Sequence, residues 1–317
     1  MSDRQSLKSN KNKSILECHP TKDGFKYHCV EDDPLCSGYI EKFLDDSGKR
    51  GHIPAFIKRK ILIPTVRLSP SDCAQQLKLS DDNMRVTGEK GYCMIRATHS
   101  VNRGKWYYEA TIESMPALSA TRIGWGQVWA NLQAPLGYDD YGYSWRSRLG
   151  TKFHKAHGKT FDKNGGYREG DTVGCMIELP YGNPTNSTTL EHLPVSVKES
   201  AHPIYDKKKT CKMLEEILKP PSKMKKNIGS KIKFYRNGQL IGTAFEDISQ
   251  GFYFPTISLY RNATVSVNFG AAFKYPPSDC SDYRAMQEAP EVEAIDITLA
   301  DMIYLVDNKE NFEKDFS

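Results

Sequence analysis

The stretch Phe234-Tyr-Arg-Asn-Gly-Gln-Leu240 decides the fold class of this chain. Asn237-Gly238 stands between two runs of β-branched and aromatic residues. Asn-Gly is a strong two-residue hairpin signal, because both turn positions of the favoured turn require positive φ, which these two residues tolerate. The stretch therefore predicts two antiparallel strands joined by a tight turn.

The run from Trp106 to Ile112 extends this prediction. Its side chains alternate with a period of two, so that Trp106, Tyr108, Ala110 and Ile112 share one face of a strand. The opposite face carries Tyr107, Glu109 and Thr111. Trp106, Tyr108 and Trp125 are expected in the core, because aromatic residues that face inward from strands usually pack.

Similar short runs recur along the chain between turn signals, which is typical of an all-β protein. The predicted strands are 77–79, 84–87, 92–97, 105–113, 120–125, 172–179, 231–236, 239–245, 252–259 and 264–269. Many short strands without helices between them predict an antiparallel β-sandwich with long loops. Cys93 and Cys175 lie inside such runs and are expected in the core.

Two long segments, 127–170 and 180–229, interrupt the predicted strands. Glycines and a proline break the periodicity between Trp125 and His154, so this stretch is predicted to be an ordered loop. Its tyrosines, tryptophans and arginines favour binding, because such side chains supply large contact areas and forked donors. The stretch lacks a nucleophile with its base, so catalysis is not expected. The segment 180–229 is predicted to be a partly mobile insertion.

The ends of the chain differ in character from its middle. Residues 1–23 are predicted to be a disordered polar and basic tail, 24–285 the main domain, and 286–317 an acidic spacer with a C-terminal helix. Leu299, Ile303 and Val306 recur at helical spacing, with Met302 beside them. This short amphipathic helix, from about Leu299 to Asn308, follows a Pro- and acid-rich spacer, Pro276 to Glu293, which could hold it off the sandwich. The helix could either dock on its own domain or bind a partner.

Composition excludes several classes of protein. No apolar run approaches the roughly 20 residues of a membrane helix, and no secretory signal is expected at the polar N-terminus. The eight cysteines include no Cys-x-x-Cys pair, so no metal site is predicted. No loop typical of cofactor binding is found either, so no other cofactor is predicted. His154 and His157 are expected on the surface. The net charge of +5 is concentrated at Lys58–Lys60, Lys207–Lys209 and Lys223–Lys226, which suit an acidic partner, nuclear import or nucleic acid.

Six motifs resemble the SPRY domain. They are Gly88-Glu-Lys-Gly-Tyr-Cys-Met94, Gly104-Lys-Trp-Tyr-Tyr-Glu109, Arg122-Ile-Gly-Trp125, Gly170-Asp-Thr-Val-Gly-Cys175, Phe234-Tyr-Arg-Asn-Gly238 and Tyr253-Phe-Pro-Thr-Ile-Ser-Leu259. Four further segments, 131–138, 143–148, 150–154 and 298–304, are similar to the Ash-two (absent, small or homeotic discs two) family. The resemblance is strong from Lys78 to Asp307.

This resemblance implies a non-catalytic, nuclear subunit of a COMPASS or MLL-type complex, in which a SET-domain enzyme methylates a histone H3 lysine. The family's SPRY domain binds an acidic, phosphorylatable segment of the WD-repeat, retinoblastoma-binding subunit. The matching pocket positions here are Tyr92, Arg122, Pro135, Tyr138, Arg146 and Arg148, and family members often have lysine at the last. Leu299, Met302, Ile303 and Val306 match the helix that binds the dumpy-thirty dimer.

The chain departs from the longer family members at its N-terminal end. Residues 1–44 show neither the length nor the cysteine pattern of the family's zinc-finger-like and winged-helix region, so nucleosome binding by that route is not expected. A short isoform or a truncated chain would explain the difference. Two alternatives stay open: a SPRY adaptor that recruits another short peptide outside chromatin, and a protein whose lysine-rich loops bind DNA or other nucleic acid.

Overall fold

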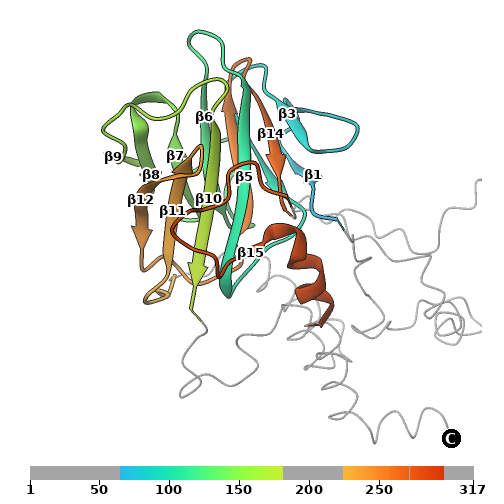
Figure 1. The fold of residues 1–317 in the computed structure, drawn as a ribbon. Helices are drawn as coiled ribbons and strands as arrows, with labels where there is room; N and C mark the ends of the chain where they lie inside the picture. The colour runs from blue at the N-terminus through green and yellow to red at the C-terminus, as the bar shows by residue number, and fades with distance from the viewer. Residues whose placement is uncertain (1–64, 181–223, 271, 296–317) are drawn as a thin grey trace, which may run out of the picture.

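In the computed structural model, residues 65–180, 224–270 and 272–295 are described, and they form two packed sheets (Figure 1). The strands are β1 (Leu68–Cys73), β2 (Lys78–Leu79), β3 (Arg85–Thr87), β4 (Tyr92–Ala97), β5 (Gly104–Ser114), β6 (Ala120–Gly126), β7 (Gly142–Arg146), β8 (Thr151–His154), β9 (His157–Thr160), β10 (Thr172–Leu179), β11 (Lys231–Arg236), β12 (Gln239–Glu246), β13 (Phe254–Tyr260), β14 (Thr264–Asn268) and β15 (Arg284–Ala285). Two short 3-10 helices, η2 (Arg148–Gly150) and η4 (Met286–Glu288), join them.

The seven-stranded sheet has the order β1-β4-β13-β6-β7-β8-β9, and the eight-stranded sheet has the order β12-β11-β10-β5-β14-β3-β2 with β15 paired to β5. All pairings are antiparallel except that of β15 with β5. The predicted all-β sandwich is therefore confirmed. Asn237 and Gly238 have φ values of 50° and 82° and form the β11–β12 turn, as their sequence predicts.

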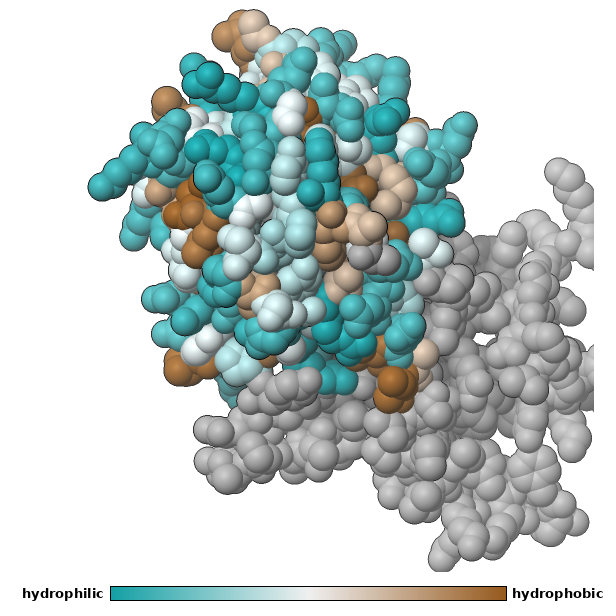
Figure 2. All heavy atoms as spheres, viewed as in Figure 1, coloured by the Kyte–Doolittle hydropathy of each residue, from teal (hydrophilic) through white to brown (hydrophobic). Residues whose placement is uncertain are grey.

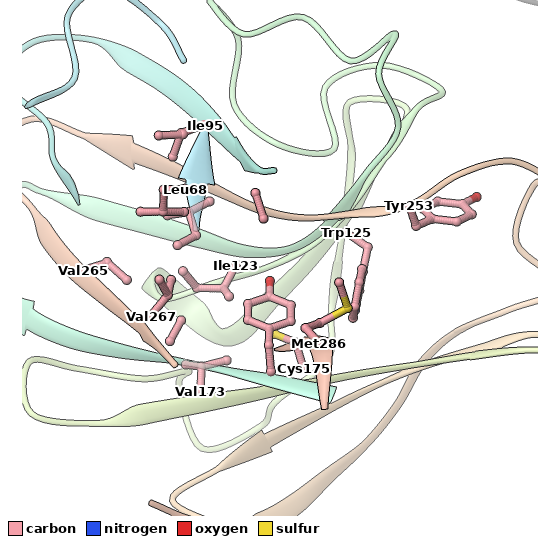
Figure 3. Packing of buried hydrophobic residues seen from close by; sticks show 14 of the residues in the cluster. Leu68, Ile95, Ile123, Trp125, Val173, Cys175, Tyr253, Val265, Val267 and Met286 are labelled. Carbon is pink, nitrogen blue, oxygen red and sulfur yellow. The ribbon is translucent and has the colours of Figure 1, made fainter. Parts of the chain in front are cut away.

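The core lies between the inner faces of the two sheets. Figure 3 shows Leu68, Ile95 and Ile123 of the seven-stranded sheet facing Val173, Val265 and Val267 of the other. Trp106, Tyr108, Trp125, Cys93 and Cys175 are buried in this cluster, as expected. Apolar side chains on the outer surface form separate patches within a mostly hydrophilic face (Figure 2).

The outer face of β5 is also buried, which alternation alone does not predict. Tyr107 packs against Phe273 and Tyr283, and the buried Glu109 carboxylate accepts backbone N–H groups from Lys274 and Tyr275 at 2.9 and 2.6 Å. The segment that follows β14 therefore crosses the outside of the eight-stranded sheet. A buried carboxylate is tolerated there because backbone donors satisfy it.

The same segment differs from the expected spacer. β15 pairs with β5, Met286 is completely buried in the core cluster, and residues 289–295 are helical. The stretch 276–293 is thus packed on the sandwich and does not hold the chain away from it. The helix predicted from Leu299 to Asn308 lies outside the described residues.

The prediction that 127–170 is irregular is wrong, because β7, β8 and β9 lie within it. Gly142 begins β7 and Gly158 lies inside β9, and each makes room for a neighbouring side chain. A Cβ on Gly142 would lie 2.8 Å from Leu136 Cδ1, and one on Gly158 would lie 2.7 Å from the Phe153 ring. β1 was also missed. It contains Pro70, which an edge strand tolerates because its outward N–H groups need no partner.

Candidate functional site: a basic pocket on the seven-stranded sheet

Two arginines stand side by side on the outer face of the seven-stranded sheet. Arg122 of β6 pairs directly with Arg146 of β7, and Ser258 of β13 pairs with Arg122 on its other side. Side chains of directly opposed residues project to the same face. Like charges in such a position are destabilising unless something lowers their repulsion.

The Phe153 ring lies close to both of these arginines. The guanidinium carbon of Arg122 is 3.8 Å from the centre of the ring, and that of Arg146 is 4.9 Å from it. The Tyr92 ring lies 5.4 Å from the Arg122 guanidinium carbon. Aromatic faces carry negative potential, so the rings attract both cations and offset part of their repulsion.

Phe153 is the member of this cluster that sequence reasoning missed. It pairs with Ser144 on one side and with Gly158 on the other, and Gly158 leaves the space that its ring occupies. Alternation along Thr151–His154 was a usable signal. It was not used because the whole segment was assigned to a loop.

The Arg122 side chain is buried and only partly satisfied. Its residue is 6% exposed, its Nη1 donates to the Leu136 carbonyl at 3.0 Å, and its Nε has no partner among the described residues. Burial lowers the pKa of this guanidinium from its ordinary value; Tyr92 opposes that shift, and the neighbouring Arg146 adds to it. Keeping the Arg122 guanidinium charged in this buried position therefore costs free energy.

No carboxylate neutralises the pocket within the part of the chain that the structure describes. The ion pairs found there involve other cations and none of Arg122, Arg146 and Arg148. A cluster of arginines without a carboxylate partner is suited to an external anion, onto which guanidinium groups fork.

The loop that carries Pro135 and Tyr138 forms one side of the pocket. The backbone N–H of Tyr138 donates to the Pro135 carbonyl at 3.0 Å, and Gly137 has a φ of 84°. A Cβ on Gly137 would lie 2.4 Å from the Phe153 carbonyl oxygen, so only glycine fits this approach. Tyr138 is 56% exposed and Pro135 is half-buried, and the carbonyl of Leu136, which follows Pro135, accepts the bond from Arg122.

The last two of the six predicted pocket residues, Tyr92 and Arg148, contact the arginines in different ways. Tyr92 is half-buried and stacks on Tyr260 at a centroid distance of 4.6 Å. Arg148 is exposed, and its carbonyl accepts the Nε–H of Arg146 at 2.9 Å. Four side chains, those of Tyr92, Arg122, Arg146 and Phe153, therefore meet in one cluster. Arg148 contacts that cluster through its backbone.

His154 differs from its expected surface position. Its ring stacks on Tyr143 at 4.0 Å, its Nδ1 lies 2.9 Å from the Gly142 carbonyl, and its Nε2 is buried. Burial lowers the pKa of this imidazole, so the neutral form is favoured. His154 thus packs between the sheets' edges and takes no part in the pocket, while His157 is exposed as expected.

Several predicted residues lie outside the described ones. They include Leu299, Met302, Ile303, Val306, Lys58–Lys60 and Lys207–Lys209. Lys225 and Lys226 are described and exposed. Among the described ranges, no group of three or more His, Cys, Asp or Glu side chains is placed to hold a metal ion, and no helix is long and apolar enough to cross a membrane.

Comparisons with known proteins identify the fold and the family of the chain. The SPRY domain family model matches residues 105–186 and 228–272. The chain is 46% identical over 300 residues to the Set1/Ash2 histone methyltransferase complex subunit ASH2 of Drosophila melanogaster, covering 92% of this chain and 51% of that protein. It is 36% identical over 297 residues to the corresponding subunit ash-2 of Caenorhabditis elegans, covering 92% of this chain and 51% of that protein.

A fungal relative extends the comparison. The Set1 complex component ash2 of Schizosaccharomyces pombe is 29% identical over 293 residues, which cover 82% of this chain and 44% of that protein. The chain spans about half the length of the curated relatives that it matches. This chain therefore belongs to the Ash2 family, and its two-sheet sandwich is a SPRY domain.

Proposed function

We propose that this chain is a non-catalytic, nuclear scaffold subunit of a histone H3 lysine methyltransferase complex, and that its basic pocket binds an acidic, phosphorylatable segment of the WD-repeat, retinoblastoma-binding subunit. Its animal relatives are named as subunits of a Set1/Ash2 histone methyltransferase complex. The observation that carries the proposal is the pairing of Arg122 with Arg146 and their joint contact with Phe153.

The pocket favours a peptide carboxylate or phosphate for a physical reason. Among the described residues, the Nε of the buried Arg122 has no partner, and Arg146 donates only its Nε. The Nη groups of Arg146 are thus left for a ligand, and a forked pair of donors matches the two oxygens of a carboxylate. An anion placed there also relieves the repulsion between the two guanidiniums.

A second contact is proposed for the C-terminal helix. Its apolar stripe of Leu299, Met302, Ile303 and Val306 would bind the dumpy-thirty dimer, since a helix this short is marginal alone in water. Bound in these two ways, the chain would support the SET-domain enzyme without supplying catalytic groups. Replacing Leu299 and Ile303 by Asp should remove dumpy-thirty from a co-purification, and its full retention would count against this contact.

The pocket is tested by charge reversal. Titration of the full chain with a fluorescent peptide that carries a run of glutamates should show at least a hundredfold loss of affinity for Arg146→Glu, about 2.7 kcal/mol. The matched control is Arg85→Glu, an exposed arginine on the other sheet, which should bind as wild type does. Equal affinity of the wild type and Arg146→Glu would refute the proposal. A phosphoserine version of the peptide shows whether phosphate strengthens binding.

The same titration separates peptide binding from the nucleic-acid alternative. Binding to a phosphate backbone falls steeply and linearly with salt on a log scale. An oligonucleotide probe should therefore bind weakly and lose affinity fast, whereas the acidic peptide should lose less. Tighter binding of the oligonucleotide at physiological salt, unaffected by Arg146→Glu, would favour the lysine-rich segments as the functional surface.

A further inference from the structure

Leu149 is an exposed leucine in a backbone conformation that leucine rarely adopts. It lies in η2, between β7 and β8, with a φ of 62° and 66% of its surface exposed. A bulky side chain at positive φ is a genuine outlier, and such outliers cluster at functional sites. Leu149 gains little from burial in the folded protein, so folding alone does not account for a leucine there.

The turn itself does not need this side chain. The N–H groups of Phe161 and Asp162 both donate to the Gly150 carbonyl, at 3.1 and 2.9 Å, and the N–H of Ser147 donates to the Thr121 carbonyl at 3.0 Å. Gly150 must be glycine, because a Cβ would lie 2.5 Å from the Asp162 carbonyl oxygen. The backbone is thus fixed on both sides of Leu149, and the leucine is presented to solvent from a rigid support.

The turn that carries Leu149 contacts the basic pocket. The Nε–H of Arg146 donates to the carbonyl of Arg148, the residue that precedes Leu149, at 2.9 Å. The guanidinium that would receive the ligand therefore rests against the turn that displays the leucine. Apolar side chains next to charged donors are typical of peptide sites, where the charge orients the ligand and the apolar contact excludes water.

We propose that Leu149 is a specificity-determining contact of this pocket, and that the acidic ligand carries an apolar side chain next to its acidic residues. This inference rests on the proposed function, since it needs the acidic segment to bind at Arg146. It adds a property that charge alone does not require: among peptides of equal charge, the pocket selects those with a correctly spaced apolar residue.

The chain supplies a matched control in Leu118. This residue, in the turn between β5 and β6, has a φ of 68° and is also 66% exposed. Its turn is closed by bonds within itself, from the N–H and hydroxyl of Ser119 to the Pro116 carbonyl at 3.0 and 2.6 Å. Leu118 therefore matches Leu149 in conformation and exposure but not in its contact with an arginine of the pocket.

The experiment uses the full chain and a set of synthetic peptides. Each contains the same run of glutamates between Gly-Ser flanks, and a single leucine is moved through the flanking positions, with a leucine-free peptide as reference. At one position the leucine should tighten wild-type binding about tenfold, which corresponds to about 1.4 kcal/mol. Leu149→Ala should lose that gain and still bind the reference peptide, whereas Leu118→Ala should keep both.

Two outcomes would overturn the inference: no position of leucine tightens binding, or Leu149→Ala keeps the full gain. Arg146→Glu distinguishes this failure from that of the proposed function, because it should weaken every peptide, including the leucine-free one. If Arg146→Glu changes nothing, the pocket is not the binding site and both proposals fail. Leu149→Gly controls for folding: glycine tolerates positive φ, so its melting temperature should equal or exceed that of the wild type.

Discussion

Arg96 and Arg122 are two buried arginines on the same face of one sheet, and they differ in what surrounds their charge. Their residues are 3% and 6% exposed. Both hold the loop that follows β6, since Arg96 Nη1 donates to the Gln127 and Ala130 carbonyls and Arg122 Nη1 donates to the Leu136 carbonyl. The Asp72 carboxylate accepts two further bonds from Arg96, each of 2.7 Å. Arg122 has no such partner in the described part of the chain and is flanked by rings and a second arginine.

This difference distinguishes an arginine whose charge is paired within the protein from an arginine whose charge is available to a ligand. The Arg96 guanidinium is fully used inside the protein, so it joins β1, β4 and the loop into one unit. The Arg122 guanidinium is held in place, and no carboxylate of the described residues pairs with it. An arginine that is buried, positioned and unpaired is the arrangement that an anion-binding site requires.

The largest expected effect comes from removing the paired arginine. Arg96→Leu should lower the free energy of unfolding by about 3 kcal/mol, because Asp72 and two loop carbonyls lose their donors in a buried place. Urea denaturation followed by tryptophan fluorescence measures this change. Lys155→Met, which removes one side of an exposed ion pair with Asp140, is the control and should cost less than about 1 kcal/mol. A similar small change for Arg96→Leu would break the comparison.

Replacing Arg122 should weaken ligand binding strongly and change stability little, the opposite of what is expected for Arg96→Leu. Arg122→Met should weaken acidic-peptide binding about a hundredfold, about 2.7 kcal/mol, because the positive charge of the pocket is reduced and Arg146 loses its neighbour. The same variant should leave stability unchanged or raise it by about 1 kcal/mol, since an uncompensated buried charge is replaced by an apolar chain. The Leu136 carbonyl keeps a donor, the Ser144 hydroxyl at 2.7 Å. Paired peptide titration and urea denaturation measure both quantities, and a loss of stability as large as that of Arg96→Leu would make Arg122 structural.

The smallest effect concerns Phe153, the ring that contacts both pocket arginines. Phe153→Leu keeps apolar volume but removes the cation–π contacts, so peptide affinity should fall about fivefold, about 1 kcal/mol. Phe153→Tyr keeps a ring face and should bind as the wild type does. Isothermal titration calorimetry resolves this difference. Equal affinities for all three proteins would mean that the ring fills space and does not position the guanidiniums.

Much of the fold was predictable from local patterns. The strands 92–97, 172–179 and 231–236 have the predicted bounds, and the hairpin at Asn237-Gly238 is confirmed, because period-two alternation and turn chemistry are short-range signals. β7 to β9 were missed, because Gly142, Gly150 and Gly158 look like strand breakers when only the sequence is known. Each instead makes room for a contact from a distant residue or from the facing strand.

The site was predictable only through family resemblance, and only in part. Composition suggested a binding role for the aromatic and arginine-rich stretch, and the resemblance supplied the six pocket positions. Neither indicated Phe153, whose role depends on its register against Ser144 and Gly158. Alternation alone did not distinguish Arg96 from Arg122, since both occupy alternating positions in strand-like runs; only the resemblance singled out Arg122.

The sequence by itself determined the β-sandwich, its tight hairpin and the segment that carries the pocket, because these follow from periodicity, turn residues and motifs along the chain. Only the tertiary structure decided which arginine pairs with a carboxylate, which ring contacts both pocket arginines and which leucine is exposed on the turn that Arg146 contacts. These properties depend on strand register and on loops that close over the sheet. Such contacts join residues far apart in the chain, and no local pattern records them.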